Sequence, residues 1–124
     1  MTRALAAAML GLALAPGAFA CGVCVDDKVA VAYDHAVVVK AAARGHVVVF
    51  AEVAGASGPA ADAVAAAKAA AMRLKGVDRD SVRGAPAPAA ISFALDPAER
   101  SPEQALAAVA RAAGLRLTLL RVMR

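Results

Sequence analysis

The chain has few aromatic residues and no cluster of basic ones. Tryptophan is absent, and the 124 residues include only one tyrosine and three phenylalanines. Lysine and arginine are scattered singly along the sequence, although the formal net charge is +4. Surfaces that bind nucleic acids combine clustered basic residues with aromatic side chains on which bases stack. The composition therefore argues against a nucleic-acid-binding protein, and we expect no nucleic acid among its partners.

Sequence motifs of the common enzyme classes are also missing. There is no glycine-rich phosphate loop before a helical segment, no serine or cysteine nucleophile with an evident base, and no spaced acidic pair at a credible cleft. The acids that do occur close together, Asp26 with Asp27 and Asp78 with Asp80, fit a helix start and a turn. We therefore expect a protein that is not an enzyme and that holds no organic cofactor.

The first 20 residues predict a removable signal peptide. Arg3 supplies a positive charge, residues 4–15 are apolar, and Ala18-Phe19-Ala20 is a small-x-small cleavage site. Pro16-Gly17 interrupts the apolar run well short of the ~20 residues that span a membrane, so we expect no transmembrane helix in the mature form. The mature protein would begin at Cys21 and would be periplasmic or secreted.

The position of Cys21 directly after the cleavage site leaves one alternative for localisation. Bacterial lipoproteins are acylated on a cysteine at this place, and acylation of Cys21 would anchor the protein to lipid. The match is poor, because those proteins prefer leucine where this chain has Ala18 and a small residue where it has Phe19.

The hydrophobic pattern after the cysteines predicts one small α+β domain. Valines dominate residues 46–54, and Ser101-Pro102-Glu103-Gln104 combines an N-cap serine, a proline at the first helical position and a capping-box glutamine. Predicted helices span residues 25–44, 60–75 and 102–113, and predicted strands span residues 46–54, 77–83, 89–95 and 115–119. In the last strand, Leu115, Leu117 and Leu119 alternate with polar residues, which predicts one covered face.

From residue 46 onward, the predicted order of elements is strand, helix, strand, strand, helix, strand. This is the order of a ferredoxin-like βαββαβ sandwich, with its helices on one face of an antiparallel sheet. The chain would then consist of the signal peptide (residues 1–20), a cysteine-containing segment with an N-terminal helix (21–45) and the ferredoxin-like domain (46–124).

Several short segments of this domain are similar to a known family. They are Gly76-Val77, Ser81-Val82-Arg83, Ile91-Ser92-Phe93, residues 101–106 and Ala113-Gly114-Leu115. They resemble the second half of the heavy-metal-associated domains of copper chaperones and metal-pumping ATPases, which implies a ferredoxin-like fold. That family binds metal through a Met-x-Cys-x-x-Cys motif after the first strand. The corresponding loop here, residues 55–59, has no cysteine, so no family ligand maps onto this chain.

The chain has instead a cysteine pair outside the domain, in Cys21-Gly22-Val23-Cys24. Two thiolates at this spacing can reach one soft ion such as Cu(I) or Zn(II). They satisfy linear Cu(I), whereas tetrahedral zinc needs further donors, such as the α-amino group of Cys21, His35, His46 or a partner. We take Cys21, Cys24 and His46 as the candidate metal ligands, with the condition that His46 approaches only if the N-terminus folds back across the domain.

Two other interpretations of the cysteine pair stay open. A pair in front of a helix can act in thiol redox chemistry, because the helix N-terminus stabilises thiolates, although Asp26 and Asp27 oppose this. The pair can also form a structural disulfide. The sequence therefore predicts an exported metal-binding or metal-delivery accessory protein. The alternatives are a thiol redox or disulfide-tethered envelope protein, a lipoprotein, or a non-catalytic module that binds another envelope protein.

Overall fold

The computed structural model describes the backbone of residues 20–124 and the side chains of residues 25–124. The predicted signal peptide lies outside the described residues except for Ala20. The elements are α1 (Ala20–Val31), α2 (His35–Ala43), β1 (Val47–Ala54), α3 (Ala60–Met72), the 3₁₀ turn η1 (Arg79–Ser81), β2 (Arg83–Pro86), β3 (Ala89–Leu95), α4 (Pro102–Ala113) and β4 (Arg116–Met123). Among residues 20–124, no helix is both long enough and apolar enough to cross a membrane.

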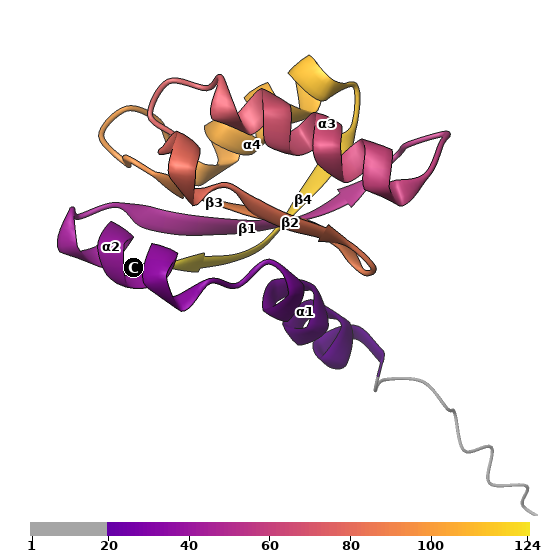
Figure 1. Ribbon diagram of the computed structural model, residues 1–124, viewed down its shortest axis with the longest axis horizontal. Coiled ribbons are helices and arrows are strands. Elements are labelled where there is room, and N and C mark those ends of the chain that lie inside the picture. Colours follow the sequence, from indigo (N-terminus) through magenta and orange to yellow (C-terminus); the bar gives the residue numbers. More distant parts are fainter. Residues whose placement is uncertain (1–19) are drawn as a thin grey trace, which may run out of the picture.

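The four strands form one antiparallel sheet in the order β2-β3-β1-β4. From β1 onward, the chain has the βαββαβ order and the strand arrangement of a ferredoxin-like fold, as predicted. Helices α3 and α4 lie on one face of the sheet, and α1 and α2 lie on the other (Figure 1). The prediction that the two helices of the sandwich share one face is confirmed, and the N-terminal helices α1 and α2 cover the opposite face.

Strand β1 is apolar except for Glu52 because both of its faces are covered. Successive side chains of a strand point to opposite faces of the sheet. Val49 and Val53 accordingly pack into the cluster under α3 and α4, whereas Val48 and Phe50 pack into the cluster under α1 and α2. A strand with only one covered face would show alternation of apolar and polar residues instead.

Helix α4 has the boundaries that the sequence predicts. The Ser101 side chain accepts a hydrogen bond from the backbone N–H of Gln104, and the Gln104 side chain accepts one from the backbone N–H of Ser101. The helix ends at Gly114, which has a left-handed φ of 67° that a side chain would disfavour.

The predicted continuous helix over residues 25–44 is wrong, because the chain forms two helices. Asp34 has an extended backbone (φ −135°, ψ 115°), and its carboxylate accepts hydrogen bonds from the N–H groups of Ala36 and Val37. An aspartate that caps a helix in this way ends the preceding helix and starts a new one. The break lets α1 and α2 take different directions beneath the sheet.

The predicted strand over residues 77–83 is also wrong. Val77 makes only an isolated bridge to Leu95, and the Asp78 side chain accepts from the N–H of Asp80 to start η1. Strand β2 begins at Arg83, the last residue of the predicted strand, and continues to Pro86. Strand β2 pairs with the next strand along the chain, β3, as an antiparallel hairpin.

The last strand, β4, is longer than predicted, and a register shift interrupts the alternation of its side chains between the two faces of the sheet. The register between β1 and β4 shifts at Phe50/Ala51, where Phe50 is opposite Arg121 and Ala51 is opposite Leu119. The extra residue, Leu120, packs toward the α1/α2 side. Leu119 is opposite Ala51, on the face that α3 and α4 cover as predicted, but it stays 37% exposed at the edge of the sheet.

Candidate functional site

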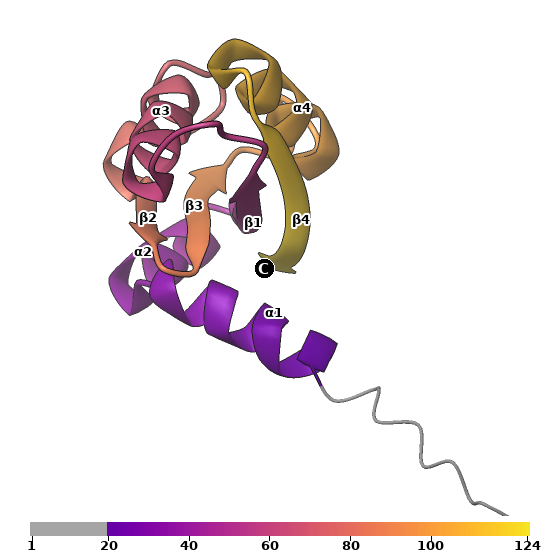
Figure 2. The same ribbon diagram turned by 90° about the vertical axis from the view of Figure 1, so that its right-hand side faces the viewer.

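Residues 26–34, which we call the crossing segment, run beneath the sheet from β4 to β2 (Figure 2). Two ion pairs hold its first half. Asp26 accepts from the Arg121 guanidinium of β4 at 2.8 Å, and the Lys28 ammonium lies 2.9 Å from the Glu52 carboxylate of β1. The start of the crossing segment is therefore tied to one edge strand and one central strand.

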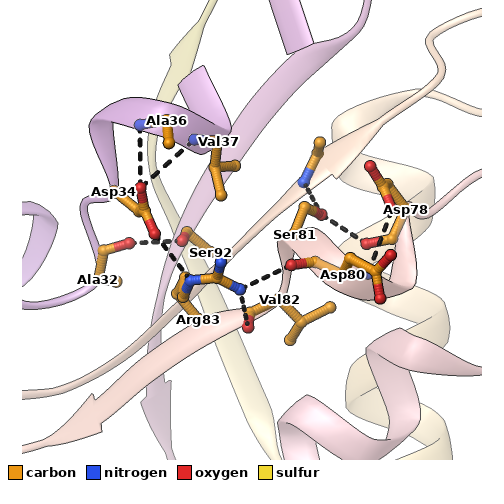
Figure 3. Close-up of polar contacts among 11 residues, drawn as sticks. Ala32, Asp34, Ala36, Val37, Asp78, Asp80, Ser81, Val82, Arg83 and Ser92 are labelled. Carbon is orange, nitrogen blue, oxygen red and sulfur yellow. Dashed lines mark hydrogen bonds and ion pairs between the residues drawn. The ribbon is translucent and has the colours of Figure 1, made fainter. Parts of the chain in front are cut away.

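The second half of the crossing segment is tied to the other two strands (Figure 3). The Ser92 hydroxyl of β3 donates to the backbone carbonyl of Ala32 at 2.6 Å in a buried position. The Arg83 Nε of β2 donates to the Asp34 carboxylate at 3.0 Å. The crossing segment thus makes one polar contact with each strand, in the order in which the strands lie in the sheet.

Apolar packing supports these polar contacts. Val29 and Ala32 are buried against the sheet in the same cluster as Phe50. The Tyr33 ring stacks on the Phe50 ring with a centroid distance of 6.5 Å and an interplanar angle of 14°. Together, packing and polar contacts fix both the position and the direction of α1 on the sheet.

Asp34 joins three parts of the molecule. The hydrogen bond from Arg83 is the main reason why the pKa of the Asp34 carboxyl lies below its ordinary value of 3.8, and the backbone N–H groups of Val37 and Ala36 act in the same direction. Arg83 also donates to the carbonyls of Asp80 and Val82, at 2.7 and 3.1 Å (Figure 3). The start of α2, η1 and the start of β2 are therefore linked through one carboxylate and one guanidinium.

The predicted ligands Cys21 and Cys24 lie near the N-terminal end of α1, which extends past β4 in Figure 2. Positions three residues apart on a helix lie on the same side, about one turn apart. The helix N-terminus favours negative charge, which stabilises thiolates. Because Asp26 is paired with Arg121, its charge opposes thiolate formation less than the sequence alone indicates.

The structure does not bring His46 to the cysteine pair. His46 precedes β1 at the α2–β1 connection, which lies at the other end of the sheet from the start of α1 (Figure 1). It is six residues before Glu52, the partner of Lys28, which corresponds to about 20 Å along an extended strand. His35 is also part of another contact, since its Nδ1 lies 3.1 Å from the Tyr33 hydroxyl.

His46 instead lines a pocket that sequence analysis missed. The pocket has a volume of about 260 Å³ and lies between α2, η1 and the ends of β2 and β3. Its charged lining residues are Lys40, Arg44, Asp78, Asp80 and Arg83. The Nδ1 atom of His46 is buried without a hydrogen-bond partner in the structure. Within the part of the chain that the structure describes, no three His, Cys, Asp or Glu side chains lie close enough together to form a metal site.

Comparison with known proteins identifies no relative. No protein-family model, no curated protein and no solved structure matches the chain. The ferredoxin-like fold itself does not indicate a function, because many unrelated activities occur on it. The function therefore has to be argued from the cysteine pair and from the way α1 is held.

Proposed function

We propose that the protein is an exported accessory protein that binds one soft metal ion, Cu(I) in the first place, through Cys21 and Cys24. The observation that supports this proposal is their place on α1. Both positions lie within one turn of a helix that the crossing segment fixes to all four strands. A pair of ligands held on a rigid element loses little freedom on binding, and soft thiolates suit Cu(I).

Two thiolates complete a linear Cu(I) site but leave tetrahedral zinc short of ligands. His46 lies in the pocket beside α2 and His35 contacts Tyr33, so a zinc ion held by Cys21 and Cys24 would take its remaining ligands from the α-amino group of Cys21 or from a partner protein. A site that is open to a partner's ligands suits transfer of the ion. We therefore propose metal delivery, within the periplasm, as the role of the pair.

Thiol redox chemistry is the second candidate. The observation that favours it is again the position near a helix N-terminus, where the pKa of a thiol is lowered and its nucleophilicity at neutral pH rises. In that case Cys21 and Cys24 would alternate between a dithiol and a disulfide, with two electrons and two protons passing to or from a partner thiol pair.

Native mass spectrometry of protein recovered from the cell envelope separates these functions. The protein is reduced under anaerobic conditions and offered Cu(I) or Zn(II), in parallel with a Cys21→Ser/Cys24→Ser variant and a His46→Ala variant. We expect one Cu(I) per chain for the natural protein and for His46→Ala, and none for the double cysteine variant. The same spectra give the mass of the mature N-terminus and so test cleavage before Cys21 and acylation.

Two results would contradict the proposal. If the natural protein takes up no ion and loses two protons reversibly on oxidation, the cysteine pair is a redox or structural disulfide pair. If the double cysteine variant binds as much metal as the natural protein, the ion is held elsewhere.

A further inference from the structure

The two edges of the sheet differ in how well they are protected against pairing with another strand. The β2 edge is only four residues long and ends at Pro86, which has no N–H to donate. The β4 edge is eight residues long and contains no proline. Among the described residues, no strand pairs with the outer side of β4.

The two faces of β4 present different side chains. Arg116 and Arg121 are opposite Ala54 and Phe50, on the face that α1 crosses, and both are exposed. On the other face, Leu117 and Val122 are half-buried against the α3/α4 cluster, and Leu119 is exposed. Side chains of any strand alternate between the two faces of the sheet. A strand added beside β4 would therefore place one set of its side chains next to the arginines and the other set next to the apolar residues.

The charges of β4 select the kind of strand that fits. Strand β4 carries two arginines and no acidic residue, and Arg124 follows directly. Antiparallel pairing of β4 with β4 of a second copy would place arginines near arginines, which is unfavourable. A carboxylate is accepted at this edge, as the Asp26–Arg121 pair shows. Both side chains of that pair are exposed to solvent, so the ion pair is weak. A partner's carboxylate can therefore replace Asp26 with little loss of free energy.

We propose that the outer edge of β4 binds an extended segment of a partner protein as a fifth strand of the sheet. The segment alternates acidic residues, which face Arg116 and Arg121, with apolar residues, which extend the row of Leu117, Leu119 and Val122. Backbone hydrogen bonds supply affinity, and the alternating side chains supply specificity. Because α1 passes the same edge, the bound segment would lie beside the helix end that carries the cysteine pair.

The test uses an octapeptide of alternating glutamate and valine, titrated against the mature protein by fluorescence anisotropy. Hydrogen exchange is measured with and without the peptide. We expect saturable binding and slower exchange of amides in residues 116–123. The same peptide with lysine in place of glutamate should bind at least about tenfold more weakly, and the glutamate peptide with every backbone nitrogen methylated should not bind. The measurement needs no metal, so it is repeated on the Cys21→Ser/Cys24→Ser variant to keep its outcome independent of the proposed metal binding.

Arg116→Glu should weaken binding of the glutamate peptide by about tenfold and strengthen binding of the lysine peptide. The matched control is Arg111→Glu, which makes the same charge change at an exposed position of α4 and should alter neither. The proposal is overturned by absence of binding, by binding that survives methylation, or by protection confined to residues outside β4. It is also overturned if the protein dimerises without peptide and the amides of residues 116–123 then exchange slowly. In that case the strand that pairs with β4 belongs to a second copy of the chain.

Discussion

The two faces of the sheet are covered in different ways. Under α3 and α4, large apolar side chains such as Ile91, Phe93 and Leu106 form a continuous buried cluster. Under α1 and α2, most buried residues are alanine or valine, Phe50 is the one aromatic ring in that cluster, and polar contacts to every strand accompany them. Apolar burial is strong but has no direction, whereas hydrogen bonds and ion pairs are directional. The comparison indicates that the α3/α4 face supplies most of the stability and that the α1/α2 face fixes where α1 lies.

The largest loss of folding stability is expected when a buried aromatic ring is removed, and one ring from each face can be compared. Phe93 and Phe50 are both almost fully buried, and removal of a buried phenylalanine ring usually costs about 3–5 kcal/mol. We expect Phe93→Ala to reach that range in urea unfolding. Phe50→Ala should cost less, about 3 kcal/mol or below, because the ring is covered by Tyr33, which is 43% exposed and can move into the space.

Hydrogen exchange then shows where each ring acts. Phe50→Ala should speed exchange in α1 and α2 and leave α3 and α4 unchanged, whereas Phe93→Ala should speed exchange throughout. If Phe50→Ala lowers protection equally on both faces, the two faces form one cooperative unit and the comparison between them fails.

A smaller loss of folding stability is expected when the hydrogen bond between the crossing segment and β3 is removed. Ser92→Ala removes the hydrogen bond to the Ala32 carbonyl and leaves that buried acceptor without a partner, which costs about 1–3 kcal/mol. The loss should appear as faster exchange in α1 and α2. Ser57→Ala, in the exposed loop before α3, is the matched control and should stay within about 0.5 kcal/mol of the natural protein. Equal effects of the two substitutions would show that the Ser92 contact does not hold the crossing segment.

Local patterns were sufficient to predict the ferredoxin-like part of the fold. The capping box at Ser101 and Gln104 marks the start of α4, and the valine run marks β1 as a strand buried on both faces. The helix break at Asp34 was missed because acids at residues 26–27 and basic residues followed by Gly45 mark the two ends of one helical segment, and only the cap contact shows the new start within it. The strand predicted over residues 77–83 failed for a similar reason, since Asp78 caps η1 there.

The arrangement around the cysteine pair was not predictable from the sequence. The partners of the crossing segment are far away in the chain, with separations of 49 residues for Arg83 and Asp34, 60 for Ser92 and Ala32, and 95 for Arg121 and Asp26. The periodicity of apolar residues reflects local structure and does not indicate contacts between residues so far apart in the sequence. The sequence predicted which residues could bind metal, whereas only the structure shows that His46 lies elsewhere, in a pocket beside α2.

The smallest change in folding stability is expected from removal of the negative charge of Asp34, at the end of the crossing segment. The pKa of Asp34 is lower in the folded protein than its ordinary value of 3.8, chiefly because of the hydrogen bond from Arg83. The carboxylate therefore stabilises the fold fully above a pH of about 4, and this contribution is lost as the pH falls through the lower pKa of the folded state. Asp34→Asn keeps an acceptor for the N-cap but removes the charge.

The difference in urea midpoint between the natural protein and Asp34→Asn, measured from pH 7 to about pH 2.5, isolates this one group from the other acids. We expect the natural protein to be the more stable above about pH 4, and the difference to shrink toward zero below that pH. In the background of Arg83→Gln the same comparison should show a weaker dependence on pH, because the main cause of the lowered pKa is gone. A difference that stays constant down to pH 2.5 would mean that the Asp34–Arg83 contact contributes no charge-dependent stability, and that packing alone holds this end of the crossing segment to β2.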